Sequence, residues 1–138
     1  MTIRFTALAV DVDDNPDDDY LSVCVAETVQ PDDDSMFLMF QCGLSEPQKL
    51  EIWHGHDTHC VVTPDQGTAY GAVEEIALRG KVLYVKLAAK ALADLDLDDP
   101  EIEVYLDVED DVIAEFRAAL RRVMTSGRPD ARPSMTGL

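Results

Sequence analysis

Apolar residues recur at every second position through much of the first two-thirds of this chain, and that period belongs to strands with one buried face. The alternation is clear over residues 3–9 and 21–25. Between them, residues 11–19 combine an Asn-Pro pair with clustered aspartates, which predicts a turn. Residues 36–40 are apolar at every position and predict a central strand covered on both faces. A weaker strand is expected over residues 59–63.

The best-defined pair of strands is a hairpin. Residues 73–78 and 82–87 flank Arg79-Gly80-Lys81, a short connection that contains glycine. The alanine- and leucine-rich residues 88–95 then predict a short helix. Residues 102–108 alternate again, with acids among their polar positions, which predicts a strand with one exposed acidic face.

An amphipathic helix follows this strand. Asp110 or Asp111 can cap its N-terminus, and Gly127 is suited to end it. Its apolar stripe consists of Val112, Ile113, Phe116, Leu120, Val123 and Met124. Core packing is the expected role of this stripe, because burying each large side chain contributes about 1.5–3 kcal/mol before entropy is counted.

These elements predict an α+β fold: an antiparallel β-sheet of about six or seven strands with a short helix and the C-terminal amphipathic helix packed on one side. The chain has 138 residues, 46% of them hydrophobic, which suits a single domain with one core. We assign this domain to residues 1–124 and expect residues 125–138 to form a flexible C-terminal tail with few anchors. The apolar strand 36–40 could lie inside the sheet or could pair across a homodimer.

The net charge of −17 is unevenly distributed along the chain. Residues 1–35 contain 10 acids and 1 base, and residues 91–111 contain 10 acids and no base. Such a chain repels nucleic-acid phosphates and anionic membrane surfaces, so neither is an expected partner. Its long-range attraction is toward a basic partner, although each acidic run taken alone can also be a solvated face that keeps the protein soluble.

The composition also indicates a cytoplasmic protein. No apolar run approaches the ~20 residues that span a bilayer, and Met1-Thr2-Ile3-Arg4 lacks the apolar segment of a secretory signal. The three cysteines, Cys24, Cys42 and Cys60, form no CxxC pair and make an odd count. That pattern favours free, buried thiols over a disulfide framework.

No catalytic motif is present. The chain lacks a Walker A sequence, a G-x-G-x-x-G loop and a G-x-S-x-G nucleophile turn. Carboxylates are so abundant that no pair stands out for acid–base chemistry, which needs one carboxyl group shifted by burial beside one that stays ionised. We therefore expect a protein that is not an enzyme and binds no cofactor.

One stretch could bind a metal. His54-Gly55-His56-Asp57-Thr58-His59-Cys60 contains imidazole, carboxylate and thiol groups that suit zinc. The spacing matches neither a paired CxxC site nor HExxH, and a polar loop leading into a strand is the simpler interpretation. A metal-binding protein or metal-dependent hydrolase that uses His54, His56 and His59 stays open as an alternative function.

Two aromatic residues could serve recognition. Tyr70 stands between Gly67 and Gly71, where the backbone is expected to turn, so it could project outward or pack in the core with a bonded hydroxyl. Trp53 is the only tryptophan of the chain. Tryptophan is enriched at binding hot spots, but a single one in a small domain is as often part of the core.

Several of these segments occur in a familiar order. They are Phe5-Thr6-Ala7, then Gln66-Gly67-Thr68-Ala69-Tyr70-Gly71-Ala72-Val73 with its hairpin, Leu92-Ala93-Asp94-Leu95, Val104-Tyr105-Leu106-Asp107-Val108 and the helix with Phe116-Arg117-Ala118-Ala119-Leu120-Arg121. Together they resemble immunity protein family 10 of bacterial polymorphic-toxin systems, over most of residues 3–124. Two departures stand out: Ala72 replaces a frequent second glycine, and the stretch from His54 to Cys60 is unusual for the family.

The resemblance implies a cytoplasmic antitoxin that binds and neutralises a cognate toxin domain, and it carries over no catalytic residue. An acidic inhibitor attracts a basic toxin over distance and speeds the encounter, so we expect the toxin domain to be basic. The expected partner-binding residues are Tyr70, Trp53, Glu101, Glu103, Asp107 and Glu109. A third interpretation is an acidic structural subunit of a larger assembly.

Overall fold

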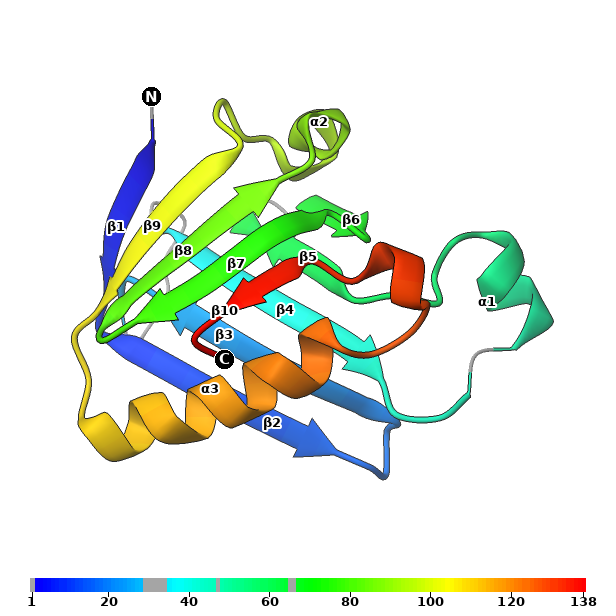
Figure 1. Cartoon of the computed structure of the whole chain (residues 1–138), viewed down its shortest axis with the longest axis horizontal. Coiled ribbons are helices and arrows are strands. Elements are labelled where there is room, and N and C mark those ends of the chain that lie inside the picture. The colour runs from blue at the N-terminus through cyan, green and yellow to red at the C-terminus, as the bar shows by residue number, and fades with distance from the viewer. Residues whose placement is uncertain (1, 29–34, 47, 65–66) are drawn as a thin grey trace.

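The computed structural model describes residues 2–28, 35–46, 48–64 and 67–138, which form two five-stranded sheets packed against each other (Figure 1). Sheet A consists, in spatial order, of β1 (Ile3–Ala7), β9 (Glu101–Leu106), β8 (Val82–Leu87), β7 (Val73–Arg79) and β10 (Ser134–Thr136). Sheet B consists of β2 (Ala9–Asn15), β3 (Tyr20–Ala26), β4 (Phe37–Gly43), β5 (Cys60–Thr63) and β6 (Gly67–Tyr70). The helices are α1 (Lys49–Trp53), the short 3₁₀ helix η2 (Ala89–Ala91), α2 (Leu92–Leu95), α3 (Asp110–Met124) and the 3₁₀ helix η3 (Pro129–Ala131).

The α+β class is confirmed, but the expected single sheet is wrong because the chain changes sheets in two places. At the first, the Ala7 carbonyl accepts the amide of Asp107 beside β9 at 2.9 Å. The very next amide, that of Leu8, donates to Ala26 on β3 at 3.0 Å. The stretch expected as one strand over residues 3–9 is therefore two strands that belong to different sheets.

The second change of sheet lies between β6 and β7. The Gly71 amide donates to the carbonyl of His59 beside β5 at 2.9 Å, and the Ala72 carbonyl accepts the amide of Ala88 after β8 at 2.8 Å. Sheet A is also mixed, because β1 pairs with β9 in parallel and β10 pairs with β7 in parallel. Side-chain alternation reports which face of a strand is buried, and it carries no information on which strand lies beside it.

The acidic stretch expected as a turn over residues 11–19 is partly a strand. Val10 and Val12 of β2 pack against the core, whereas Asp11 and Asp13 are exposed, so the alternation of a strand continues through the aspartates. The turn itself is confined to residues 16–19, between β2 and β3. The sequence also predicts a Pro-Asp turn over residues 31–35, which falls largely outside the described residues.

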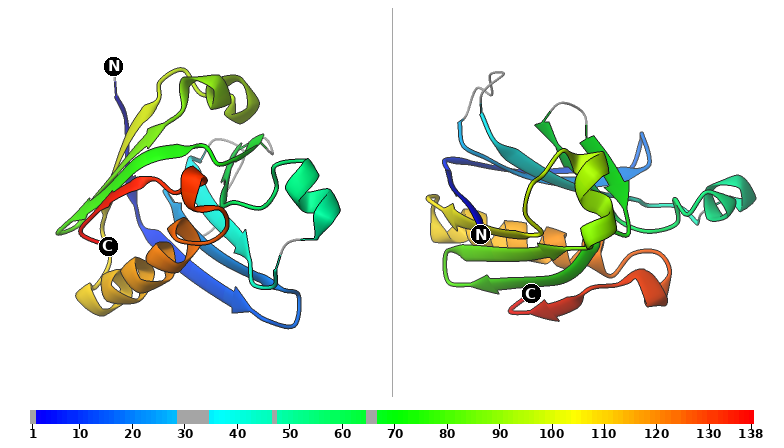
Figure 2. Two further views of the ribbon diagram at one scale, coloured as in Figure 1. Left: turned by 45° about the vertical axis from the view of Figure 1, so that its right-hand side comes forward. Right: turned by 90° about the horizontal axis from the view of Figure 1, so that it is seen from above.

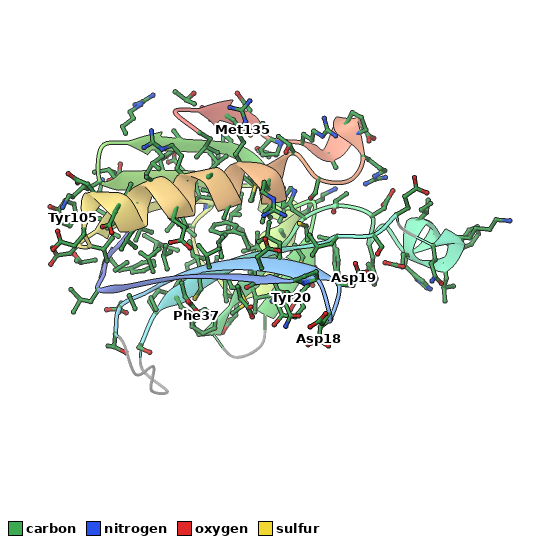
Figure 3. All side chains as sticks on the ribbon, turned by 90° about the horizontal axis from the view of Figure 1, so that it is seen from below. Asp18, Asp19, Tyr20, Phe37, Tyr105 and Met135 are labelled. Carbon is green, nitrogen blue, oxygen red and sulfur yellow. The ribbon has the colours of Figure 1, made fainter. Side chains whose placement is uncertain are left out.

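The C-terminal amphipathic helix is confirmed as α3, which lies between the two layers and packs on β2, β3 and β4 (Figures 1 and 3). Five residues of the predicted stripe are buried and Val112 is half-buried. The N-cap position is Glu109, whose side chain makes no capping hydrogen bond, so the expected cap at Asp110 or Asp111 is wrong; both lie in the first turn. One continuous core joins α3 to both sheets, and its largest buried side chains include Phe40, Leu83 and Phe116.

The hairpin, the short helix and the central strand are also confirmed. β7 and β8 are joined through Gly80, whose φ of +61° suits glycine. The short helix comprises η2 and α2, and the strand expected over residues 102–108 is β9. The apolar strand expected over residues 36–40 is β4, which is paired on both edges, with β3 and β5. Its backbone is therefore already used inside sheet B, which favours the internal strand over pairing across a homodimer.

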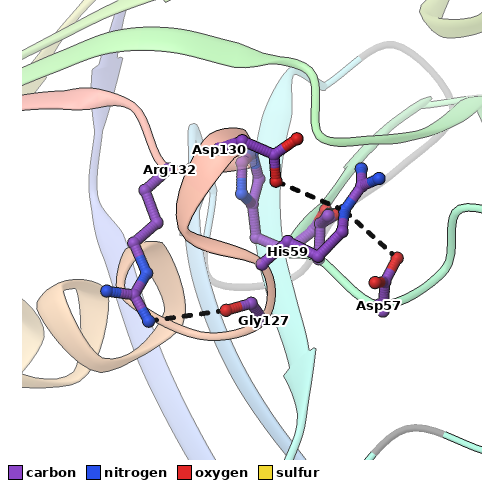
Figure 4. Close-up of polar contacts among 7 residues, drawn as sticks. Asp57, His59, Gly127, Asp130 and Arg132 are labelled. Atoms are coloured by element: carbon purple, nitrogen blue, oxygen red, sulfur yellow. Dashed lines mark hydrogen bonds and ion pairs between the residues drawn. The ribbon is translucent and has the colours of Figure 1, made fainter. Parts of the chain in front are cut away.

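Residues 125–138, expected as a tail with few anchors, contact the rest of the domain (Figure 4). The Arg128 amide donates to the Asp57 carbonyl at 3.1 Å, and the Arg128 guanidinium lies 3.4 Å from the Asp57 carboxylate. β10 pairs with β7, and Arg121 of α3 donates to the Leu138 carbonyl at 3.0 Å. These anchors are mostly backbone and ionic contacts, which composition does not reveal. The division of the chain at residue 124 stays a prediction.

The state of the cysteines and the length of the helices can be compared with the sequence analysis. The three cysteines are free, Cys42 and Cys60 buried and Cys24 half-buried. Burial raises the pKa of the Cys24 and Cys60 thiols to about 11, so neither is an activated nucleophile at neutral pH. Among the described residues, no helix combines the length and apolar character needed to span a bilayer.

Candidate protein-binding surface

Helix α1 projects from one end of the molecule (Figures 1 and 2). None of its residues is buried: the exposed fractions are 69% for Leu50, 51% for Ile52 and 84% for Trp53. The helix is held locally by a capping box, in which the Gln48 amide donates to the Glu51 carboxylate at 3.2 Å. Its shape therefore does not depend on burying its apolar side chains, which remain available to another protein. Trp53 is not part of the core.

Tyr70 is the second exposed aromatic of this region. It ends β6, and Gly71 follows with a φ of +61° that allows the backbone to turn toward β7. The Tyr70 ring is 43% exposed and stacks on His56, with ring centroids 4.1 Å apart and an interplanar angle of 16°. Partial burial raises the pKa of its phenol. Of the two interpretations of Tyr70, the structure favours the exposed aromatic over the core tyrosine.

The acidic turn between β2 and β3 lies against the chain that enters α1 (Figure 3). Asp17, Asp18 and Asp19 are all exposed. The Ser45 hydroxyl donates to the Asp19 carboxylate at 2.7 Å, and the Leu44 amide donates to the Asp19 carbonyl at 3.3 Å. These two bonds hold the turn, with its carboxylates, against the chain that leads into α1.

A shallow hollow on the outer face of sheet B adjoins α1. It is lined by residues that include Tyr20, Gln41, Glu51, His56, Cys60 and Tyr70. The Tyr20 hydroxyl donates to Asp13 at 2.5 Å, and this bond raises the pKa of the Tyr20 phenol. We call α1, this hollow and the turn over residues 17–19 together the α1 surface. It presents apolar, aromatic and acidic groups side by side.

The three histidines do not converge on one point. His54 and His56 lie on the surface with ring centroids 5.7 Å apart. His59 is buried, and its Nε2 accepts the Val73 amide at 3.2 Å. Burial lowers the pKa of His59 to about 4, so the ring is neutral at pH 7. Within the described ranges no three His, Cys, Asp or Glu side chains are grouped to hold a metal, so the structure gives the metal alternative no support.

Glu101 and Glu103 lie elsewhere, on β9 at the outer face of sheet A. Glu103 forms an ion pair with Arg4 on β1 at 3.0 Å. The Tyr84 hydroxyl donates to Glu101 at 2.7 Å, and this bond raises the pKa of Tyr84 to about 12. Lys86 stands opposite Glu101 in the β8–β9 register. Both carboxylates therefore already have partners or opposite charges within this chain.

Asp107 and Glu109 are exposed in the connection between β9 and α3. The predicted binding residues thus fall into separate groups: Tyr70 and Trp53 belong to the α1 surface, and the acids belong to sheet A and to this connection. The structure does not bring the six residues together into one site. Which of them contact a partner stays a prediction.

The sequence interpretation missed Leu50 and Ile52, because α1 was not expected. Two signals in the sequence could have indicated it. Gln48 and Glu51 have the spacing of a capping box, and three apolar residues follow one another closely in an otherwise polar stretch. The closeness of the acidic turn to α1 had no such signal, since it depends on the β3–β4 pairing that brings residues 19 and 44 together.

Comparison with known proteins adds one match. No curated protein and no solved structure matches the chain. A family model described as immunity protein 10 matches residues 6–114, a range that contains all of sheet B and α1. Because the match extends over well more than half of the 138 residues, in agreement with the resemblance seen in the sequence, the chain belongs to the immunity protein 10 family.

Proposed function

We propose that this protein is a bacterial immunity protein that binds a cognate polymorphic-toxin domain in the cytoplasm and neutralises it through an acidic surface, without catalysing a reaction. The observation that carries the proposal is the family match over residues 6–114. The proposal also fits the chemistry of the chain, in which the thiols of Cys24 and Cys60 have raised pKa values and His59 is buried and bonded to the backbone.

The distribution of charge supports a basic toxin domain as the partner. The chain carries 28 acids against 11 bases, and the described acids of β2 and of the turn after it are exposed. Carboxylates held on a rigid sheet attract a cationic protein before contact and can speed the encounter by ~10–10³-fold at low salt. A toxin domain that acts on nucleic acid is a natural example, because its own substrate is a polyanion.

Charge alone does not give a complex that dissociates slowly. Exposed ion pairs contribute about 0–1 kcal/mol each, so tight inhibition needs apolar or aromatic anchors that become buried in the complex. The exposed side chains Leu50, Trp53 and Tyr70 are of this kind. A protein that covers the toxin in this way neutralises it by occupying its surface, and it is released unchanged.

Co-expression tests the proposal directly. The product of the gene beside this one, which the proposal expects to be the toxin, is produced in a host that lacks the protein, with and without a plasmid that supplies it. We expect growth to stop without the protein and to be restored with it. We also expect the two proteins to co-purify in a fixed ratio. The control is an immunity protein of an unrelated toxin, supplied at the same level, which should not restore growth.

Two outcomes would contradict the proposal. One is a host that dies even though both proteins are present in soluble form, with no complex detected. The other is a growth defect on deleting this gene in a strain that carries no toxin, which would favour the structural subunit of a larger assembly.

A further inference from the structure

We propose that the α1 surface is where the protein docks on its partner, with Leu50, Ile52 and Trp53 entering an apolar depression of a basic protein. This inference rests on the proposed function, since the partner meant is the toxin domain. It adds the surface, the anchor residues and the chemistry of the complementary site.

The apolar side chains of α1 are left in solvent by the fold of this chain. Leu50, Ile52 and Trp53 are more than half exposed, and no residue of the helix is buried. The helix keeps its shape through Gln48 and Glu51 instead. A soluble protein rarely leaves such a group of large apolar side chains in water on a projecting helix unless another molecule covers them.

Large exposed apolar side chains gather at this end of the molecule. Among the described residues, those that are both large and exposed are Leu8, Leu44, Leu50, Ile52, Trp53, Tyr70, Val82 and Tyr105. Five of these belong to this end of the molecule. Three are in α1, Leu44 lies in the chain that enters it, and Tyr70 stacks on His56, which follows α1 in the sequence. A central apolar group of this kind is where binding energy concentrates in protein interfaces.

Charge complementarity indicates the kind of partner. Asp17, Asp18 and Asp19 in the turn, Glu46 in the chain entering α1 and Glu51 in α1 are all exposed, and the base of α1 is Lys49. A complementary surface therefore has an apolar depression with lysine or arginine at its rim. A second copy of this chain does not fit, because the two acidic rims would face each other.

The hollow beside α1 gives the complementary surface one more feature. Glu51, Tyr20 and Tyr70 are among the residues that line it. A carboxylate next to aromatic rings suits an arginine side chain, which can pair with the acid and lie against a ring. Within the part of the chain that the structure describes, the Glu51 carboxylate accepts only the neutral Gln48 amide and keeps further acceptor sites, whereas Glu103 on sheet A is paired with the cation of Arg4.

The experiment measures binding of the purified toxin encoded by the neighbouring gene, by calorimetry, to two matched double variants. Leu50→Ser with Trp53→Ser removes the proposed anchors. Val82→Ser with Tyr105→Ser removes side chains that are 40% and 47% exposed on the outer face of sheet A. We expect Kd to rise about 100-fold or more for the first pair and to stay within about 3-fold for the second. Since α1 buries none of its residues, the first variant should unfold at the same temperature as the wild type.

A second readout follows the anchor itself. Trp53 is the only tryptophan, so a chain labelled with fluorotryptophan gives one ¹⁹F resonance that reports on α1 alone. We expect this resonance to shift and broaden when the unlabelled toxin is added. A resonance that does not change in a saturated complex would overturn the docking site.

A third pair of variants tests the rim. Asp17, Asp18 and Asp19 changed together to Asn should slow association about tenfold at low salt. The same change at the exposed Asp94, Asp96 and Asp98 lowers the charge equally but lies by α2, so it should slow association far less. Equal slowing by both triple variants would mean that the acids of the turn have no special place in the complex.

The outcomes separate this inference from the proposed function. Wild-type protein that does not bind the toxin defeats both. Tight wild-type binding that Leu50→Ser with Trp53→Ser leaves unchanged, or that Val82→Ser with Tyr105→Ser abolishes, defeats the α1 surface and leaves the function standing. Self-association lost in the α1 variant while toxin binding is kept would assign the surface to a second copy of the chain.

Discussion

At the scale of single residues, burial gives His59 a titration unlike that of an exposed histidine. Its pKa is about 4 in the folded protein, against a usual 6.5, because the ring is removed from water. As pH falls from 6.5 to 4, His59 is protonated in the unfolded chain but stays neutral in the folded chain. The stability that depends on a neutral His59 is therefore complete above pH 6.5 and is lost across this window.

The pH dependence gives a prediction. His59→Gln keeps a hydrogen-bond acceptor but cannot titrate, so its unfolding free energy should fall less between pH 7 and pH 4.5 than that of the wild type. The difference should be on the order of 2–3 kcal/mol. Urea unfolding at the two pH values measures it, with the exposed His54→Gln as the control. Parallel behaviour of all three proteins would mean that His59 titrates as an exposed side chain does.

Gly127 allows a second test at this scale. Its φ is +71°, and a Cβ placed there would lie 2.1 Å from the Asp57 carbonyl oxygen. Gly80 has a similar φ of +61° but open space around it. Gly80→Ala should therefore cost about 1–2 kcal/mol, from backbone strain alone, and Gly127→Ala about 3 kcal/mol or more. Thermal unfolding compares the two, and similar costs would contradict the close contact at Asp57.

At the scale of elements, a truncation can test how much the segment after α3 contributes to stability. A truncated chain that ends at Gly127 would lose β10 from the edge of sheet A. It would also leave the buried Asp57 carboxylate without Arg128. We expect this truncation to cost about 2–4 kcal/mol of unfolding free energy. We also expect slow hydrogen exchange for the amides that β10 shares with β7. Unchanged stability together with fast exchange over residues 134–136 would restore the flexible tail predicted from the sequence.

The sequence predicted some elements better than others for a physical reason. α3 and the β7–β8 hairpin follow from local patterns, an apolar stripe of helical period and a glycine connection, so both were found. The second sheet was not found, because the exchange of partners at Leu8 and at Gly71 leaves alternation undisturbed. β6 and β10 are short and polar, and only their neighbours make them strands.

The candidate site shows the same division. Tyr70 and Trp53 could be singled out by residue type, and both prove to be exposed. Their grouping with the turn at Asp19 could not be predicted, because residues 19, 53 and 70 are joined only by the strand order of sheet B. The acids of β9 looked available in the sequence, whereas the fold supplies Arg4 and Tyr84 as their partners.

At the scale of the whole molecule, the net charge of −17 predicts how association depends on salt. Between low ionic strength and about 0.5 M salt, screening shortens the reach of the carboxylates to a few ångströms. The rate of association with the neighbouring gene's toxin should fall by about tenfold or more, while the dissociation rate changes little. Stopped-flow mixing over a salt series measures both rates. An association rate that is independent of salt would contradict a basic partner.

The origin of the strands in each sheet has a consequence for synthesis. All strands of sheet B come from residues 9–70, whereas sheet A requires β1 and also β10, which ends at Thr136. A nascent polypeptide can therefore assemble sheet B on the ribosome long before the far edge of sheet A has been translated. Until then the apolar inner surface of sheet B is not covered by sheet A and α3. The protein therefore needs a chaperone most while the second half of the chain is being translated.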